Sequence, residues 1–371
     1  MKRLPRRLLL PVLLGALQFP AAQAYSPLGH EIVGAIADER LANTPTAAKV
    51  HKLLGRLTLE KAAVIADVIR GWDKKGVDDP RSFHIPGPRY IDKQLRDFWR
   101  ANPPTSVDPD TPSHHWFHYT DVPVEPAQRY GDGSVGRSKW DIVHMIPFCV
   151  QVLQGQVPEQ NERKITKPVA LILLAHYVGD IHQPLHVGAE YFDQQGRIVD
   201  PDKDRSALGD EGGNTFTLEL SDEPPRRRGT HKKKLHGFWD NDAVNGLFSS
   251  MPTMLRKKEF LKGIEPLSKD LIHEMASHES DNWRMPANLN VNNYAEAWAD
   301  EIIPSAREAH ARLEFIKVHP LQHEGSVVAA GEAVEKPTAD QMNYRAWATD
   351  VVRQQLHKAG WRLADLLEKI L

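Results

Sequence analysis

The sequence predicts a mainly α-helical fold. Apolar residues recur at helical spacing over most of the chain, and the best strand pattern is the short NTFTLEL segment at 214–220, where we expect a small hairpin. With 41% hydrophobic and 26% charged residues among 371, the composition is that of a globular protein. The expected helices span 30–41, 59–72, 143–153, 168–181, 235–248, 294–315 and 344–370.

The segment 344–370 gives the clearest helix prediction. Its apolar residues form one stripe: Val352, Leu356, Ala359, Leu363, Leu366 and Ile370. Three other segments, 73–113, 187–234 and 317–337, are rich in polar or turn-forming residues and are expected to be loops. We therefore predict one helical domain over residues 25–371 with two long loop insertions, at about 73–113 and 187–234.

Residues 1–24 have the pattern of a secretory signal peptide. Four basic residues precede an apolar run at 8–17, and small residues follow at 21–24. The alternative, a membrane anchor, is disfavoured because a spanning helix needs ~20 apolar residues. We expect a secreted or periplasmic protein without stable membrane insertion, beginning at Tyr25.

Removal of this leader changes the formal net charge from −2 to −6, because it takes away four basic residues and no acidic ones. A mildly acidic chain has no global attraction to nucleic acid, so phosphate binding must come from a local site. The single cysteine, Cys149, excludes an intrachain disulfide framework, and its apolar neighbours predict a buried, inert thiol.

The 18 histidines carry most of the functional information. In LILLAHYVGDIHQPLH, His176 and Asp180 lie four residues apart and share one face of a very apolar helix, and His186 follows Pro184. LHGFWD repeats this spacing with His236 and Asp240. Such pairs suit zinc, which binds imidazole and carboxylate groups. The alternative for each pair is a buried His–Asp hydrogen bond.

Three further residues lie in or beside apolar segments: His30, Asp67 and His118. Each of these residues alone is weak evidence for a metal site. Together with His186 and the two His–Asp pairs, they make a set of five histidines and three aspartates. This number exceeds one tetrahedral zinc site, so it suggests a cluster in which a carboxylate bridges two ions.

The order of these motifs resembles a known family. It runs Gly-His, Ala-Asp, Trp-x-His-Tyr-x-Asp, His-x-x-x-Asp-x-His-Gln-Pro-Leu-His, Asp-x-Gly-Gly-Asn and Leu-His-x-x-Trp-Asp. This is similar to the zinc-dependent single-strand nucleases, typified by the fungal nucleases S-one and P-one and the plant bifunctional nucleases, with bacterial phospholipase C as a more distant relative. The resemblance runs from about residue 25 to 371 and implies the phospholipase C/P-one nuclease-like helical fold.

The resemblance implies three zinc ions. The first would be held by Asp67, His118, His176 and Asp180. The second would be held by Asp180, His30 and the freed amine and carbonyl of Tyr25, and the third by His186, His236 and Asp240. Two neighbouring ions can generate a hydroxide and clamp a displacement at phosphorus.

Two features depart from the family pattern. Tyr25 stands where the family has Trp, and the alternative is that cleavage falls elsewhere and Tyr25 is disordered. Asp67 and His118 are 51 residues apart, so the insertion must loop out, and Asp73 is the fallback for Asp67.

The resemblance implies a role in substrate recognition for four residues. Tyr119 would stack on a base, Asp121 would accept hydrogen bonds from the base edge, Asn214 would lie beside the nucleotide, and Arg70 would face the scissile phosphate. Ordinary packing for Tyr119 and a solvated surface for Arg70 are the alternatives. The basic runs at 226–228 and 232–234 would guide a polynucleotide or, as we favour, form a flexible solvated loop.

The leading prediction is therefore a trinuclear zinc phosphodiesterase that hydrolyses single-stranded DNA and RNA to nucleoside 5′-phosphates, with 3′-nucleotidase activity, as a monomer. A phospholipase C and a non-catalytic zinc-binding protein are the alternatives. His114 and His115 are not assigned as zinc ligands, because we expect them to surround the ligands or to lie on the surface. His182 is expected to orient a neighbouring ligand.

Overall fold

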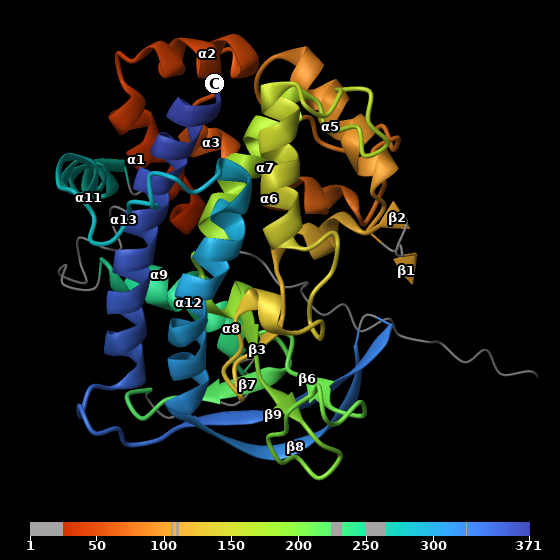
Figure 1. Cartoon of the computed structure of the whole chain (residues 1–371), viewed down its shortest axis with the longest axis vertical. Helices are drawn as coiled ribbons and strands as arrows, with labels where there is room; N and C mark the ends of the chain where they lie inside the picture. The colour runs from red at the N-terminus through yellow and green to blue at the C-terminus, as the bar shows by residue number, and fades with distance from the viewer. Residues whose placement is uncertain (1–24, 105–106, 109–110, 224–231, 249–264, 324) are drawn as a thin grey trace, which may run out of the picture.

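The computed structural model describes residues 25–104, 107–108, 111–223, 232–248, 265–323 and 325–371. The predicted leader at 1–24 lies outside these residues. The fold is mainly α-helical, as predicted. Figure 1 shows long helices running along the longest axis, with a β-hairpin across their lower end.

The helices expected at 30–41, 143–153, 168–181, 294–315 and 344–370 occur, with ends that differ by a few residues. The predicted helix 59–72 is divided into three short helices, and 235–248 combines two short α-helices with a π-helical stretch. The α-helices are α1 Pro27–Leu41, α2 Pro45–Leu54, α3 Leu59–Ala62, α4 Ile65–Val68, α5 Arg89–Ala101, α6 Ile142–Gln154, α7 Lys167–Asp180, α8 Leu235–Gly237, α9 Val244–Gly246, α11 Glu265–Ser277, α12 Tyr294–Ala311 and α13 Tyr344–Ile370. Shorter 3-10 turns are η1 Ile69–Trp72, η2 His114–His118, η3 Tyr130–Asp132, η4 Pro184–His186 and η6 Val291–Asn293, and η5 Phe238–Ala243 is π-helical.

Side-chain caps explain several of the helix starts. The Thr44 side chain accepts a hydrogen bond from the Ala47 backbone amide at the start of α2, and Asp141 does the same for His144 at the start of α6. Asn343 caps α13 through the Ala346 amide at 2.8 Å. Each cap satisfies a backbone N–H that has no partner within the helix.

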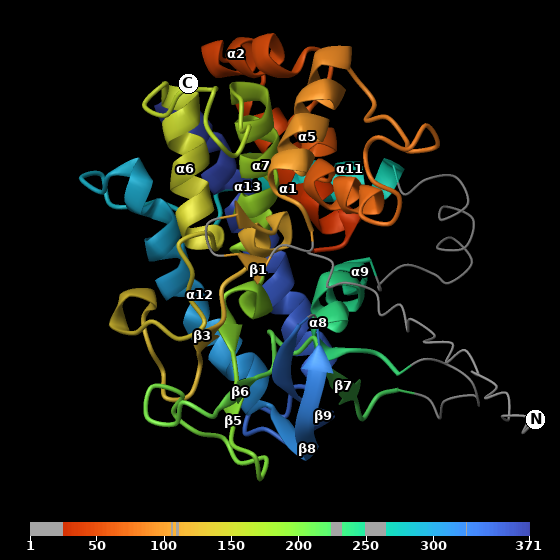
Figure 2. The ribbon, with the colours of Figure 1, turned by 90° about the vertical axis from the view of Figure 1, so that its right-hand side faces the viewer.

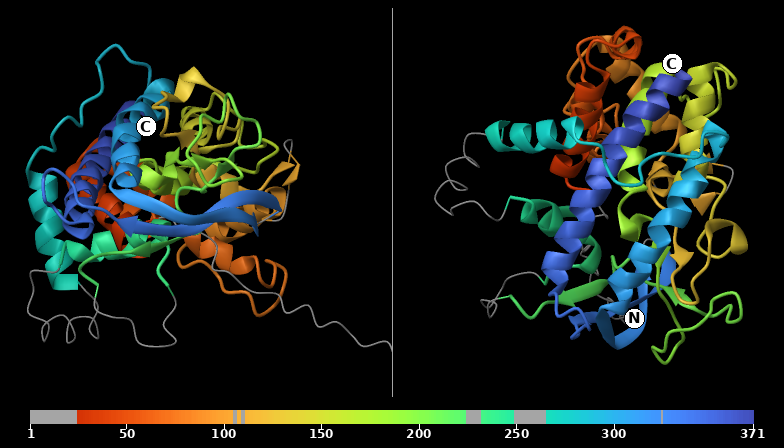
Figure 3. Two further views of the ribbon diagram at one scale, coloured as in Figure 1. Left: turned by 90° about the horizontal axis from the view of Figure 1, so that it is seen from below. Right: turned by 60° about the vertical axis from the view of Figure 1, so that its left-hand side comes forward.

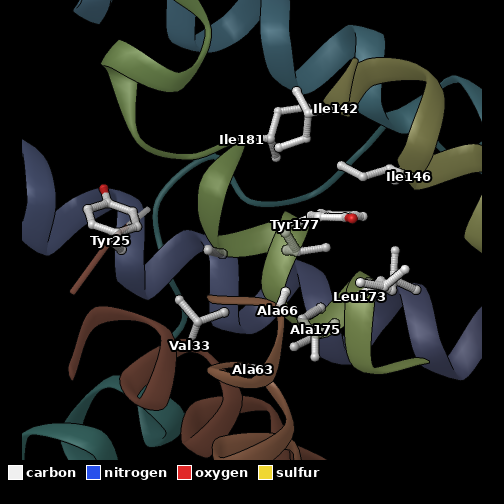
Figure 4. Close-up of a cluster of buried hydrophobic side chains, with 14 of the residues drawn as sticks. Tyr25, Val33, Ala63, Ala66, Ile142, Ile146, Leu173, Ala175, Tyr177 and Ile181 are labelled. Atoms are coloured by element: carbon white, nitrogen blue, oxygen red, sulfur yellow. The ribbon is translucent and has the colours of Figure 1, made fainter. Parts of the chain in front are cut away.

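Helix α7 is the centre of the core. Every residue from Pro168 to Asp180 is buried, because α6 packs on one side and α1, α3 and α13 pack around the rest. Figure 4 shows its side chains Leu173 and Tyr177 among residues from α6 and from the α3–α4 region. The two polar residues of α7 that the sequence singled out are therefore held in a rigid apolar surrounding.

The strands are fewer and mostly short. They are β1 Val107–Asp108, β2 Thr111–Pro112, β3 Val122–Pro123, β4 Gly188–Ala189, β5 Tyr191–Phe192, β6 Leu208–Gly209, β7 Phe216–Glu219, β8 Leu313–His323 and β9 Ser326–Glu335. β7 pairs parallel with β9, and β9 pairs antiparallel with β8, with Phe216 opposite Gly331. Figure 3 shows the β8–β9 hairpin from below, crossing the helix ends.

Two strand predictions were wrong. The segment 317–337 is not a loop, since β8 and β9 fill most of it. The 214–220 segment contains a strand, β7, but its strand partner is the distant β9, and the nearer segment contributes an isolated antiparallel bridge between Thr217 and Lys234. The two errors differ in cause. The partner of β7 lies more than 100 residues away, which no local pattern shows, whereas β8 and β9 form a local hairpin whose turn lies between His323 and Ser326 and was not recognised.

The two predicted loop insertions contain regular structure. In 73–113, α5 buries Ile91, Leu95 and Phe98 at spacings of four and three, and it packs on α7. Figure 2 shows α5 beside α7. In 187–234, the described part holds β4 to β7. The helices α2 and α11 were also not foreseen.

The basic run at 232–234 is not a solvated loop, which corrects the favoured interpretation. The Lys232 ammonium lies 2.9 Å from Glu332, and Lys233 pairs with Asp242. Lys234 donates to the Thr215 carbonyl at 3.0 Å. These lysines tie the segment to the sheet and to η5, while the run at 226–228 lies outside the described residues.

Within the described part of the chain, no helix has the length and apolar character needed to cross a membrane. Cys149 is buried in α6, and burial raises the pKa of its thiol. The prediction of an inert thiol therefore agrees with the structure.

Candidate metal centre

Asp180 at the end of α7 is the hub of the site. Its Oδ2 lies 3.0 Å from His118 Nδ1 and 3.0 Å from His176 Nε2, and its Oδ1 lies 3.2 Å from His30 Nε2. The three histidines come from η2, α7 and α1, so tertiary packing brings together what the sequence separates. His176 and Asp180 share one helix face, as the four-residue spacing predicted.

Asp67 on α4 completes this first group. Its Oδ1 lies 3.9 Å from His176 Nε2, and Asp67, His118 and His176 offer ligand atoms within 4.8 Å of one another. His30, His176 and Asp180 satisfy the same limit. Asp67, rather than the fallback Asp73, therefore lies in the cluster.

Burial would raise the pKa of the Asp180 carboxyl, but the charges of His176, His186 and His30 outweigh burial and hold that pKa well below its usual range. Asp180 is consequently ionised. A buried carboxylate needs cationic or hydrogen-bonding partners on both oxygens, and among the described residues Oδ1 has His30 Nε2 at 3.2 Å but makes no hydrogen bond. A divalent cation fits this unmet requirement.

A second group lies next to the first. His236 Nε2 is 3.1 Å from His186 Nε2 and 3.5 Å from Asp240 Oδ2, and His186 Nε2 is 3.8 Å from Asp240 Oδ1. Asp180 Oδ1 is 3.9 Å from His186 Nδ1, so the two groups are neighbours. Asp240 belongs to the π-helical η5, a backbone form often found at functional sites.

Backbone carbonyls fix the orientation of three imidazoles. The Nδ1 atoms of His176, His186 and His236 lie 2.6, 2.8 and 2.8 Å from the carbonyl oxygens of Ala63, His118 and Gly212. An Nδ1–H that donates to a carbonyl leaves the Nε2 lone pair of the neutral ring directed at the site. This is the usual arrangement that supports a metal-binding histidine.

The facing Nε2 atoms of His186 and His236 fit a zinc ion. Two nitrogens 3.1 Å apart need a shared proton or a cation between them, because two bare lone pairs at this distance would repel each other. Two nitrogens bound at ~2.05 Å to one tetrahedral zinc lie ~3.3 Å apart, close to the observed separation. Burial disfavours a charge on His186, but Asp180 and Asp240 outweigh burial and raise its pKa to about 9. The site therefore attracts positive charge.

Two glycines allow the N-terminal segment to approach this centre. A Cβ added at Gly179 would lie 2.8 Å from His30 Nδ1, and one added at Gly29 would lie 2.9 Å from Tyr25 Cβ. Real Cβ atoms essentially never show such contacts. Any side chain at position 179 would thus displace His30 from Asp180.

Tyr25 is ordered against the core, which contradicts the alternative of a disordered residue. Its side chain is fully buried, and its hydroxyl donates to the His182 carbonyl at 3.2 Å. The next residue, Ser26, donates its amide to the Asp240 carbonyl at 2.8 Å. The role of the Tyr25 amine and carbonyl as metal ligands stays a prediction.

A pocket opens over both groups of ligands, and Arg70, Tyr119, Asp121 and Asn214 all line it, as predicted. Arg70 Nη1 lies 3.7 Å from Asp67 Oδ1, and Asn214 donates from Nδ2 to the Glu211 carbonyl at 2.8 Å. Burial, with a smaller effect of Glu211, holds the pKa of Asp121 well above its usual range. The role of Asp121 as a hydrogen-bond acceptor for a base edge stays a prediction.

Sequence reasoning missed two pocket residues, Glu211 and His323. His323 Nδ1 lies 2.7 Å from Glu211 Oε2, and both line the pocket. His323 is at the end of β8, in the hairpin that was expected to be a loop. Glu211 sits inside the Asp-x-Gly-Gly-Asn motif, which was the one signal that pointed to it.

The His182 side chain orients none of the clustered His and Asp residues, although its backbone carbonyl accepts from the hydroxyl of Tyr25, a predicted ligand residue. Its Nδ1 lies 2.7 Å from the Val178 carbonyl, and its Nε2 lies 2.9 Å from the Arg362 guanidinium. Because the ring is buried and beside a fixed cation, its pKa is well below the usual range. His182 therefore joins α7 to α13 and lies outside the ligand clusters.

Together these features define a helical protein in which two buried clusters of His and Asp side chains, able to hold metal ions, lie under a polar pocket. The family model for S1/P1 nuclease matches residues 25–371, so the chain belongs to this family. It is similar to Endonuclease 4 of Arabidopsis thaliana, with 28% identity over 181 residues, 46% of this chain and 50% of that protein. Endonuclease 1 of the same plant is 25% identical over 221 residues, 55% of this chain and 61% of the relative. The chain thus spans between a half and two thirds of the length of these relatives.

Proposed function

We propose that this chain is a secreted or periplasmic trinuclear zinc phosphodiesterase that hydrolyses single-stranded DNA and RNA to nucleoside 5′-phosphates, with 3′-nucleotidase activity. One observation carries the proposal. Two buried clusters of His and Asp side chains share Asp180 as a neighbour, and both lie beneath one pocket that also holds an aromatic ring and a guanidinium group.

The donor set favours zinc. Imidazole nitrogen and carboxylate oxygen are ligands that zinc accepts readily, and the Nε2 separations match zinc geometry. Asp67, His118, His176 and Asp180 would hold one ion, Asp180 and His30 a second, and His186, His236 and Asp240 a third. Bound zinc would supply a water of lowered pKa and charge neutralisation at phosphorus.

The protein groups around the centre would position the substrate. Arg70, whose positive charge is partly balanced by the adjacent Asp67, would donate to a non-bridging phosphate oxygen. Tyr119 would stack on an unpaired base, worth ~1–3 kcal/mol per base, and it would do so for any base. Asp121 and Asn214 would hydrogen-bond the base edge. A duplex hides its base faces, so this pocket favours single strands.

We propose further that the free amine of Tyr25 is a ligand of the second ion. The buried Tyr25 ring and the close approach at Gly29 support this assignment, because they hold the residue near His30. A chain that keeps residues 1–24 would lack the free amine and should bind one zinc ion less tightly. Metal titration of chains that begin at residue 1 and at residue 25 tests this point.

The experiment that tests the function combines zinc counting with assays of four substrates by the chain beginning at Tyr25: single-stranded DNA, single-stranded RNA, a duplex and phosphatidylcholine. We expect about three catalytic zinc ions, 5′-mononucleotides from single-stranded DNA and RNA, and slow attack on a duplex of the same sequence. Release of phosphocholine from phosphatidylcholine without mononucleotides would identify a phospholipase C instead. Full zinc loading with no hydrolysis of any substrate would identify a non-catalytic zinc-binding protein.

A further inference from the structure

A third set of metal-ligand side chains lies outside the centre described above. Asp73, His114 and His115 offer ligand atoms within 4.8 Å of one another. His115 Nε2 lies 2.8 Å from Asp73 Oδ2, and His114 Nε2 lies 3.4 Å from Asp73 Oδ1. None of the three belongs to the ligand set proposed for the three zinc ions.

His114 has an unmet bonding requirement. The residue is 1% exposed, and its Nε2 has no hydrogen-bond partner, although it points to the carboxylate. Burying an imidazole nitrogen without a partner costs free energy. A cation bound between His114 and Asp73 removes this cost.

The surrounding residues hold the three side chains in place. Trp99 on α5 donates from Nε1 to Asp73 Oδ1 at 2.8 Å, and the Ser113 hydroxyl accepts from the His115 amide at 3.2 Å. These hydrogen bonds fix the carboxylate and the start of η2. Supporting hydrogen bonds of this kind are typical of metal ligands.

We propose that Asp73, His114 and His115 form a further site for a divalent transition metal, best suited to zinc. Two imidazoles and one carboxylate leave a fourth position of a tetrahedron for water or a substrate oxygen. His115 also lines the pocket that contains Tyr119, so the site lies in the pocket wall.

The position of the site in the chain suggests what the ion does. Asp73 begins the inserted segment and His114 directly follows it, so one ion would join both ends of the insertion. Closing a long segment with a metal removes chain entropy from the unfolded state. The ion would also place positive charge beside a bound polynucleotide backbone.

Zinc counting on the chain beginning at Tyr25 tests the proposal. Wild type, Asp73→Asn, His115→Ala and His84→Ala are each loaded with excess zinc, freed of loose metal by gel filtration and analysed for zinc per chain. His84 is the matched control, because it forms an exposed pair with Asp92 at 2.8 Å in the same insertion but has no second histidine there. His115 is only partly buried, so its removal preserves the core if Asp73→Asn fails to fold.

We expect Asp73→Asn and His115→Ala to bind one zinc per chain less than wild type, and His84→Ala to equal wild type. Equal zinc in wild type and His115→Ala overturns the proposal, and so does loss of all zinc from that variant, because the site would then not be separate. The difference of one ion does not depend on whether single-stranded DNA is cut. The failure of this proposal is therefore distinguishable from failure of the proposed nuclease function.

Discussion

Replacing Gly179 by alanine gives a sharp test of the metal centre without touching a ligand. The added methyl would lie 2.8 Å from His30 Nδ1, whereas ordinary contact begins at 3.4 Å, so His30 must move by about 0.6 Å. Ligand distances at a metal site tolerate only ~0.2 Å. Alanine favours helix by ~1 kcal/mol over glycine, which partly offsets the overpacking cost of ~1–3 kcal/mol. The fold should survive while the site does not.

We expect Gly179→Ala to weaken zinc binding at the ion shared by His30 and Asp180 by ~10–100-fold, and to lower single-strand hydrolysis by a similar factor. Competitive titration with a zinc chelator measures the first effect, and initial rates on single-stranded DNA measure the second. The control is Gly237→Ala, which is next to His236 but where an added Cβ meets nothing within 4 Å. Wild-type zinc affinity in Gly179→Ala, or an equal loss in Gly237→Ala, would refute the steric reasoning.

Three further predictions concern the hub, the pocket and a buried acid. Asp180→Asn should lose two zinc ions and reduce hydrolysis below detection, because it removes the shared carboxylate; metal analysis with full retention of zinc would contradict this. Tyr119→Ala should raise KM on single strands ~5–150-fold, from ~1–3 kcal/mol of stacking, with unchanged zinc content, whereas Tyr119→Phe should match wild type. Burial raises the pKa of Glu190 to about 7, so the folded state holds this proton more tightly than the unfolded state. Stability should therefore fall by ~3 kcal/mol as pH rises from about 4.5 to 7, and urea unfolding of Glu190→Gln should lack this loss.

Much of the metal centre was predictable from the sequence. His176 with Asp180, and His236 with Asp240, share a helix face because four residues make about one turn, and this follows from local geometry alone. The apolar residues around His176 also indicated that the pair would be buried. Glycine at 179, by contrast, gave no such signal, since the need for it arises from His30 on another helix.

The sequence could not decide between Asp67 and Asp73. Both are acidic residues in the same short segment, six positions apart, and only the packing of α4 and η1 against α7 places Asp67 beside His176. The same packing places the Asp73 carboxylate beside His114 and His115. Similarly, His323 reaches the pocket through the β8–β9 hairpin, whose pairing with β7 depends on contacts more than 100 residues apart.

The helical class, the ligand types and the pairs that one helix turn brings together were predictable from the amino-acid sequence, because these depend on repeats of three to four residues. The meeting of the two pairs, the closure of the insertion and the entry of Glu211 and His323 into the pocket became clear from the folded structure alone. Those features depend on how distant segments pack, and no local periodicity records the distance between them.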